Sequence, residues 1–518
     1  MRALTIPRLL VAILFIAIFT MAVRLPADTD TWWHLRSGQY IVENRAVPTT
    51  DPFSHTMAGQ PWIDHGWLAQ IFWYSLYALG GWPGLSLGLA VLVTLTFALV
   101  WQVTPGNLYT RAFSVVIGAI TSAVIWVARP QMVSFFLAGA ILFMLETYKR
   151  EQRRWIYAFP LLILLWANIH GGYAIAFMLL GVYVVGEAFN RLTRHREDPA
   201  LTWRQIGLLL LLGGVGFALV AVNPHGWQMW LYPFRTVGIG ALRDFIQEWR
   251  SPDFHLSMTW PFVGMLLLTL AALGRSGRRA DWTDLAVLGL WIFWSLFAAR
   301  NIGLYGLLTI PALARYADAA WGVYLPGERK QLQGTEGINE IEETQGTEGT
   351  KGTGKVPSVP LVPRSSFSSP RLNWILLSLV VIAGLVKIGV ALNPREVIKA
   401  EQEGLPAKAV QFIQEHKPAG PLFNSYNWGG YLIFKLWPEY PVYIDGRTDL
   451  YDDVFIRRYL NVAAGGEGWR QALDEDGINL VLIESDSSLA RLLKHDAAWD
   501  ILYQDTMATV FARPVSSQ

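Results

Sequence analysis

The sequence lacks cysteine and contains few charged residues. Without cysteine the chain has no disulfide and no thiolate metal site, although this absence does not identify the compartment. Charged residues make up 16% of the 518 residues, whereas soluble globular proteins are usually about a quarter charged. The formal net charge is only +2, so no basic excess indicates a nucleic-acid partner. In contrast, 53% of the residues are hydrophobic and 24 are Trp. This composition predicts an integral membrane protein.

The apolar residues gather in blocks of membrane-crossing length. About 20 residues at 1.5 Å per residue cross the roughly 30 Å of hydrocarbon, and there the backbone must satisfy its own hydrogen bonds as a helix. Arg2 and Arg8 precede the first block as in a signal peptide, but no small-residue cleavage site follows, so we expect a retained span. We predict about 11 transmembrane helices, at 8–24, 84–103, 112–128, 131–148, 155–169, 172–190, 206–222, 259–273, 281–298, 302–321 and 373–392.

The basic loops predict the orientation of these spans. Lys and Arg collect at 149–154, 191–196 and 275–279, and short basic loops stay on the cytoplasmic side. With the N-terminus inside, all three loops are cytoplasmic if the aromatic-rich segment 66–82 is an interfacial or re-entrant helix. If that segment crosses, the same loops lie outside. We therefore predict a multi-pass membrane protein with a cytoplasmic N-terminus.

The organisation along the chain follows from these spans. Residues 1–325 form the predicted transmembrane domain, with an outer loop at 25–83, and the last span is 372–393. Residues 326–371 contain Gly-Thr-Glu-Gly repeats and a Pro/Ser tract, which predict a disordered cytoplasmic linker. Residues 394–518 alternate short β-like runs with amphipathic helical stretches, which predicts a small extracytoplasmic α/β domain. The predicted strands are 421–424, 442–445, 480–484 and 506–512, and the predicted helices are 407–415, 454–460, 469–474 and 488–494.

A dense polar string follows the first span: Asp28-Thr-Asp30-Thr-Trp-Trp-His34-Leu-Arg-Ser-Gly38. Asp30 is predicted to cap a helix that runs to about Glu43. Asp28 has no such duty, and two carboxylates beside a membrane are costly if buried and unpaired. This pair is therefore a candidate functional site.

Further polar residues belong to the same predicted outer face. Asp64 and His65 follow Asp51 and His55 in the first loop; these types could bind a divalent cation, but no spacing here is diagnostic of one. Asp64 could equally cap the next helix. The residues at the outer ends of later spans could each serve a structural purpose, by reaching lipid head groups or satisfying broken backbone. Together they predict a site for an anionic, polyhydroxylated ligand, because Arg binds phosphate oxygens in pairs. They are Arg129, His170, Asn223, His225, Arg300 and Asn301.

Two strings stand out in the C-terminal region. Tyr426-Asn-Trp-Gly-Gly-Tyr431 and Asp445-Gly-Arg-Thr-Asp449 combine glycine with polar and aromatic residues. A tight turn after a strand explains the second string as well as a functional role does, and both readings stay open.

The layout of residues 1–321 resembles the GT-C superfamily of glycosyltransferases, and within it the family 39 enzymes that use dolichyl- or polyprenyl-phosphate mannose. One span, a long outer loop with early acidic residues and a run of short-looped spans carry the resemblance. It implies that Asp28 and Asp30 supply the catalytic base, and that Ala128-Arg129-Pro130-Gln131 matches an Arg-Pro turn between later spans. The stretch 61–67 lies where the family often has a His-Pro-Pro-Leu-like sequence, but the prolines are missing. The Asp28 to Gly38 string and both C-terminal strings also resemble a group of bacterial membrane proteins.

The leading interpretation is a membrane-bound inverting glycosyltransferase of cell-envelope assembly. It would move a sugar from a polyprenyl-phosphate donor to an envelope glycan or protein acceptor on the outer face of a bacterial inner membrane, as the resemblance implies. His34, Asp64, His65, Arg129 and Arg300, with His170, Asn223, His225 and Asn301, are the predicted substrate-binding residues. No cofactor is certain from the sequence, and a divalent cation stays possible. The alternatives are a non-catalytic, flippase-like transporter, which predicts inverted repeats and broken helices at mid-membrane, and a scaffold of glycan assembly.

Overall fold

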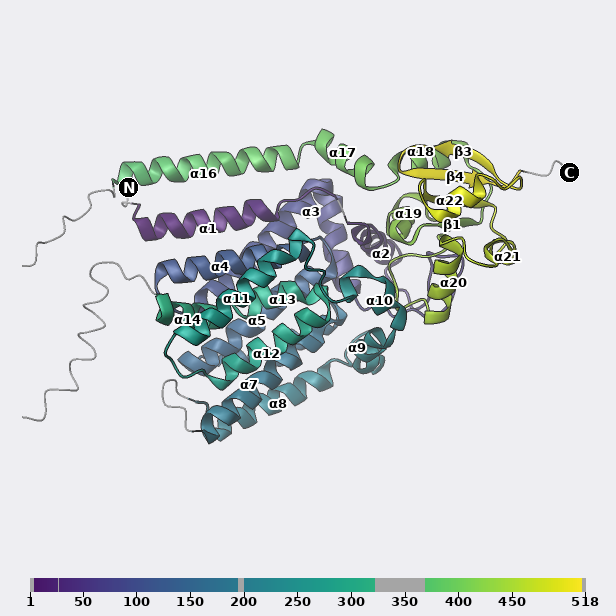
Figure 1. Cartoon of the computed structure of the whole chain (residues 1–518). Coiled ribbons are helices and arrows are strands. Elements are labelled where there is room, and N and C mark those ends of the chain that lie inside the picture. Colours follow the sequence, from purple (N-terminus) through teal and green to yellow (C-terminus); the bar gives the residue numbers. More distant parts are fainter. Residues whose placement is uncertain (1–3, 27, 194–199, 322–368, 515–518) are drawn as a thin grey trace, which may run out of the picture.

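The computed structural model describes residues 4–26, 28–193, 200–321 and 369–514. Within this part of the chain a block of roughly aligned helices lies beside a smaller unit with a four-stranded sheet (Figure 1). Most of the predicted linker at 326–371 lies outside the described residues.

The helical block reproduces the predicted apolar segments. Its helices are α1 (Ile6–Ala22), α3 (Trp67–Val103), α4 (Leu108–Ser122), α5 (Pro130–Glu151), α6 (Phe159–Ala167), α7 (Ala174–Leu192), α8 (Trp203–Leu219), α11 (Trp260–Arg275), α12 (Trp282–Phe297), α13 (Ile302–Leu308), α14 (Ile310–Trp321) and α16 (Pro370–Ala391). Among the described residues, six helical segments are long and apolar enough to cross a membrane, and shorter apolar helices cover 6–22, 154–167, 203–219 and 282–297. The segment predicted at 302–321 breaks at Thr309, where Pro311 lacks the N–H of a continuous helix.

Helix α3 is two segments joined at a kink. Its 37 residues would measure about 55 Å if straight, far more than the roughly 30 Å of hydrocarbon. Gly81 has a φ of 57°, a conformation that residues with a Cβ rarely adopt. Beyond the kink the two segments lie against each other, since a Cβ on Gly84 would lie 2.3 Å from the carbonyl oxygen of Leu76. The kink falls at the predicted boundary between segment 66–82 and the span at 84–103.

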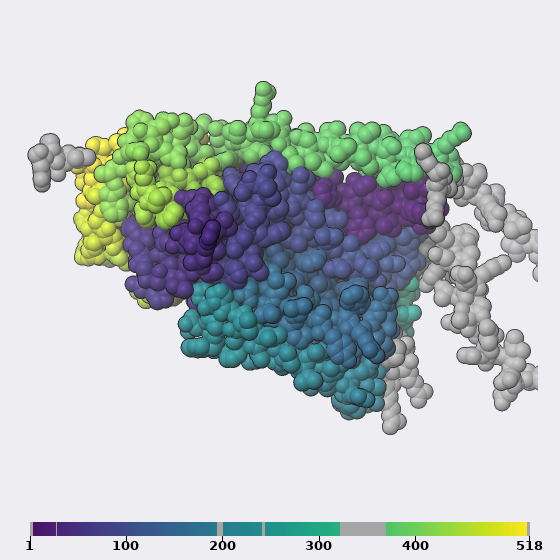
Figure 2. Space-filling view, turned by 180° about the vertical axis from the view of Figure 1, so that it is seen from behind, coloured from purple at the N-terminus to yellow at the C-terminus, as the bar shows by residue number. Residues whose placement is uncertain are grey.

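The first and last apolar helices run parallel. At their starts, the Asn373 amide donates to the Leu4 carbonyl at 2.7 Å. Near their ends, Lys387 Nζ donates to the Val23 carbonyl at 2.5 Å. Helix α16 otherwise has little contact with the block, because only 6% of its most apolar 18-residue stretch is buried. Figure 2 shows this helix along one edge of the molecule, over α1. Two parallel spans require an odd number of crossings from the first to the last, which agrees with the predicted parity.

Buried charges at the far end of the block are paired. Lys149 Nζ lies 2.6 Å from both Glu187 and Asp281, and all three side chains are almost fully buried. Arg315 forms a second buried pair with Asp284. Ionisable groups at membrane depth are expensive unless paired, so these ion pairs join α5, α7, α12 and α14.

The C-terminal unit begins directly after α16. It contains α17 (Pro394–Gly404), α18 (Ala407–His416), β1 (Leu422–Asn424), α19 (Gly429–Leu436), α20 (Asp453–Ala463), α21 (Trp469–Glu475), β2 (Leu480–Glu484), α22 (Ser488–Leu493), β3 (Asp500–Gln504) and β4 (Ala508–Ala512). The sheet order is β1-β2-β4-β3, with β1 and β2 parallel and the other pairs antiparallel. The four predicted helices and three of the predicted strands are confirmed.

The sheet differs from the prediction in two places. Residues 442–445 are not a strand of the sheet, because Val442 instead exchanges backbone hydrogen bonds with Phe53 and His55 of the first loop. Strand β3 was not predicted from the sequence, because it is an edge strand whose residues are mostly exposed.

Helix α2 (Asp30–Asn44) connects the two units. It crosses α3 closely, since a Cβ on Gly38 would lie 2.2 Å from the Gln70 carbonyl oxygen. On its other side it meets α19, where the Trp32 ring lies 5.5 Å from Tyr431 and 5.2 Å from Phe434. One apolar core therefore runs from the helical block through α2 to one face of the sheet, and a second core fills the other face.

A buried ion cluster also joins the C-terminal unit to the first loop. Arg447 contacts Asp51 at 2.5 Å and Asp445 at 2.7 Å, and Tyr451 donates to Asp445 at 2.8 Å. The Arg447 guanidinium also lies 4.8 Å from the centre of the Trp62 ring. The Asp-Gly-Arg string is therefore a turn fixed to the first loop.

We predict that Arg447→Met strongly lowers the thermal stability of the purified protein. Removing one member of a buried ion pair costs about 3–5 kcal/mol, because the partner charges stay buried without compensation. Arg457→Met is the matched control: Arg457 pairs with Asp244 and Asp453 on the surface, where ion pairs contribute little. Equal melting temperatures for the two variants would contradict the structural role of the cluster.

We predict that cysteines introduced at Glu43 and Glu467 share one membrane side and that a cysteine at Arg154 lies on the other. All three positions are exposed, and Arg154 follows α5 at the end away from Arg129. The basic-loop distribution assigns the first two to the outside. Membrane-impermeant maleimide should label them in intact spheroplasts and label position 154 only after permeabilisation. The reverse pattern would invert the predicted orientation.

Candidate functional site

A cavity of about 1380 Å³ lies between the helical block and the C-terminal unit. Its walls include the polypeptide after α1 and the loop before α5. A third wall is the segment from the end of α10 (Gly240–Phe245), which follows α9 (Gln228–Gly238), to the start of α11. The turns after β1 and before α20 complete the cavity. Four of the predicted site residues line it: Asp28, Asp30, Arg129 and Arg300. The topology therefore brings residues more than 270 positions apart in the chain to one cavity.

Arg129 holds the two aspartates together. Its Nε donates to Asp28 at 2.7 Å, a second guanidinium nitrogen also contacts Asp28, and Nη1 lies 2.9 Å from Asp30. Pro130 begins α5, so Arg129 leaves the helix start in an extended conformation. The side chain is only 18% exposed. This arrangement satisfies two carboxylates that would otherwise repel each other.

Asp28, not Asp30, caps helix α2. The Asp28 carboxylate accepts from the Thr31 backbone N–H at 2.8 Å and from the Thr31 hydroxyl at 2.7 Å. The predicted capping role of Asp30 is wrong, because the helix already begins at Asp30 and its carboxylate turns to Arg129 and the cavity.

The two carboxylates differ in acidity. Burial raises the pKa of Asp28, but Arg129 and the hydrogen bonds from Arg129 and Thr31 outweigh burial and leave this pKa below its usual value. For Asp30, burial is again the largest effect, and the charges of Asp28, Glu248 and Asp445 add to it. With only Arg129 in opposition, the pKa of Asp30 rises to about 6. Asp30 is thus the more basic carboxylate, and its side chain is 26% exposed.

Glu248 and Arg300 complete the charged part of the cavity. Glu248 belongs to the short 3₁₀ helix Gln247–Trp249, and its carboxylate lies 3.9 Å from Arg129 and 3.8 Å from Arg300. The Arg300 guanidinium stacks 4.1 Å from the centre of the Trp249 ring. Nothing in the sequence singles out Glu248, because a single glutamate in a polar loop carries no distinguishing pattern.

The C-terminal unit supplies the opposite wall. Tyr426, Asn427 and Thr448 line the cavity there. A Cβ on Gly446 would lie 2.1 Å from an Asp30 carboxylate oxygen, so only glycine permits this approach. Both C-terminal strings noted in the sequence therefore border the cavity.

The other predicted site residues do not line this cavity. The Asn223 amide donates to the Ala167 carbonyl, and the Asn301 amide donates to the Trp294 carbonyl. The His170 ring accepts from the Gly172 backbone N–H. These contacts are the structural roles that the sequence left open for such residues. Four further predicted site residues also lie outside the lining of the cavity: His34, Asp64, His65 and His225.

The histidines and Asp64 form a second, buried polar cluster. Gln70 donates to Asp64 at 2.7 Å and lies 3.5 Å from His34, while His65 packs 5.5 Å from His170, centre to centre. Burial raises the pKa of Asp64 to about 7. Burial also lowers the pKa of His34, His65, His170 and His225. The imidazoles of the cluster are therefore largely uncharged near neutral pH, whereas the Asp64 carboxyl titrates in that range.

The donor set does not fit a metal ion. Within the described part of the chain, no three His, Cys, Asp or Glu side chains converge as metal ligands. Between Asp28 and Asp30, the position that a cation would take is filled by the Arg129 guanidinium.

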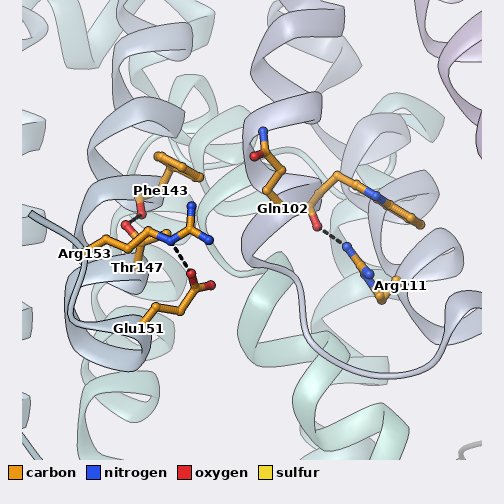
Figure 3. A pocket seen from close by; sticks show the side chains of 7 residues that line it. Gln102, Arg111, Phe143, Thr147, Glu151 and Arg153 are labelled. Carbon is orange, nitrogen blue, oxygen red and sulfur yellow. Dashed lines mark hydrogen bonds and ion pairs between the residues drawn. The ribbon is translucent and has the colours of Figure 1, made fainter. Parts of the chain in front are cut away.

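A smaller cavity of about 280 Å³ lies near the other end of the helical block (Figure 3). Arg111 donates to the Trp101 carbonyl there, and Arg153 pairs with Glu151 at 2.6 Å. Its charged groups already have partners inside the protein, and none of the predicted site residues lines it.

Comparison with known proteins gives a likeness of fold. No protein-family model matches the sequence, and no curated protein matches it. The oligosaccharyltransferase AglB from Archaeoglobus fulgidus, in complex with an inhibitory peptide and a dolichol-phosphate, is similar with a TM-score of 0.55 at 11% identity, over 98% of this chain and 74% of that one. An Archaeoglobus fulgidus oligosaccharyltransferase in the apo form gives a TM-score of 0.53 at 12% identity, over 92% of this chain and 69% of that one. ArnT from Cupriavidus metallidurans bound to undecaprenyl phosphate gives 0.49 at 15% identity, over 98% of both chains. The protein therefore has the GT-C-like membrane fold that its sequence resemblance implied.

Proposed function

We propose that the protein is an inverting glycosyltransferase that takes a sugar from a polyprenyl-phosphate donor on the outer face of the membrane. The observation that carries this proposal is a carboxylate of raised pKa, Asp30, facing the same cavity as two arginines. A general base and a site for a phosphate leaving group are the two parts that such a transfer needs. Among proteins of similar fold, AglB carries a dolichol-phosphate.

In the proposed reaction the acceptor hydroxyl attacks the anomeric carbon of the donor sugar. Asp30 takes the hydroxyl proton as the new glycosidic bond forms. The bond between the anomeric carbon and the phosphate oxygen breaks on the opposite side, so the configuration inverts. The polyprenyl phosphate leaves with the electron pair.

Arg129 and Arg300 share one role in this scheme, and Asp28 has another. Both guanidinium groups stabilise negative charge that grows on the leaving phosphate, a common electrostatic contribution to catalysis. Asp28 positions Arg129 and the start of α2, and its hydrogen bonds keep it ionised. Asp28 is therefore a positioning residue, and Asp30 alone acts as base.

The remote polar cluster would support the site rather than contact substrate. His34 lies on α2 one turn after Asp30 and meets Gln70 of α3. Acceptor groups would instead meet Tyr426, Asn427 and Thr448 on the C-terminal wall. Hydroxyl, amide and phenol groups of this kind suit an envelope glycan or a polar peptide as acceptor.

We expect Asp30→Asn to lower transfer by about 10²–10⁴-fold, the usual contribution of a general base. The measurement is release of radiolabelled sugar from polyprenyl phosphate by purified protein in the presence of membrane acceptors. Asp486→Asn is the control, since Asp486 lines the far wall of the same cavity and is exposed. A folded Asp30→Asn protein with full activity would refute the assignment of the base.

The pH dependence follows from the raised pKa of Asp30. A general base acts only when ionised, so kcat/KM should fall as the pH drops through about 6 and level off above it. Burial and neighbouring carboxylates put this midpoint above that of an ordinary aspartate. A profile that stays flat down to pH 5 would exclude Asp30 as the titrating base.

A further inference from the structure

The Glu248 carboxylate lies where two arginines converge. It is 3.9 Å from an Arg129 nitrogen and 3.8 Å from an Arg300 nitrogen, and its side chain is 41% exposed. Asp28 and Asp30, in contrast, contact Arg129 at 2.7 and 2.9 Å. Glu248 is therefore the loosely held anion of the group.

The Glu248 side chain can leave the two arginines by a change of rotamer, because it is partly exposed and its ion contacts are long. The backbone of its 3₁₀ helix, Gln247–Trp249, need not move with it. Among the described residues, the two arginines are the closest polar partners of the Glu248 carboxylate. The Arg300 guanidinium meanwhile stays fixed against the Trp249 ring. The arginines are thus better anchored than the anion between them.

The charge balance argues that Glu248 and a bound phosphate exclude each other. With Asp28, Asp30 and Glu248 ionised, three carboxylates face two guanidinium groups. A phosphate would add a further negative charge to a site that already has an excess of one. With Glu248 withdrawn, two carboxylates and two guanidinium groups remain, and the arginines have donors to offer to phosphate oxygens.

We propose that Glu248 occupies the place of the donor phosphate and that a lipid-linked phosphate binds by exchanging with its carboxylate. This inference rests on the proposed function. The Glu248 side chain then acts as an internal competitor that keeps Arg129 and Arg300 paired until a donor of sufficient affinity arrives. The residue tunes the affinity for phosphate and does not take part in the chemistry.

The test is the affinity of purified protein for undecaprenyl monophosphate without any sugar, in detergent with a chelator present. Glu248→Gln should bind this probe about three- to tenfold more tightly than wild type, because it loses a weak, partly exposed pair of ion contacts that the phosphate must displace. Arg300→Gln should bind it more weakly. Unchanged melting temperatures will show that the variants are folded.

Asp253→Asn is the matched control. Asp253 lines the same cavity five residues further along the chain, but it pairs with His255 and contacts neither arginine. Removing its charge changes the general field of the cavity without freeing the arginines. An equal gain for both variants would reduce the effect to general electrostatics and overturn the exchange.

The remaining outcomes separate this inference from the proposed function. If wild type binds the probe and Glu248→Gln binds it equally or more weakly, the exchange is wrong and the lipid-phosphate site stands. If neither wild type nor any variant binds the probe, the proposed donor class fails, and the exchange fails with it.

Discussion

The guanidinium of Arg129 is the interaction on which the cavity depends. It joins the polypeptide after α1 to the start of α5, and it lies between two carboxylates that would repel each other without it. Asp28 receives two of its contacts and both Thr31 donors, whereas Asp30 receives one. Because hydrogen bonds to an ionised carboxylate lower its pKa, the same arginine makes one aspartate a fixed anion and leaves the other poised for proton transfer.

The C-terminal unit takes part in the same construction. Its core continues through α2 into the helical block, and its glycines approach the chain near the aspartates more closely than any other residue could. The buried cluster around Arg447 fixes the Asp-Gly-Arg turn against the first loop. Buried contacts therefore hold the C-terminal wall of the cavity against the first loop and the start of α2.

The sequence predicts the helices and the convergence of Asp28, Asp30, Arg129 and Arg300 because membrane thickness and charge asymmetry leave few arrangements. It cannot tell which aspartate caps α2, since the exact first residue of the helix decides this and sequence patterns do not fix it to one or two positions. It also cannot find Glu248, because hydropathy reports which segments are apolar and not which loops meet. The predicted histidines lie near the cavity, but they do not line it, because they contact residues of a separate polar cluster. The edge strand β3 carries no alternation of buried and exposed residues, and so it has no pattern to detect.

The buried histidines bear on Asp30 through their lack of charge. A cationic imidazole near Arg129 would favour the ionised form of Asp30 and pull its pKa back toward the ordinary value. Burial holds the pKa of His34 and of His170 well below the usual value, so both rings stay neutral where Asp30 titrates. The cluster thus gives α2 polar anchoring through Gln70 without adding a positive charge. Asp30 can stay basic beside Arg129 because burial and the charges of Asp28, Glu248 and Asp445 outweigh that arginine, and the neutral rings of His34 and His170 add no further positive charge.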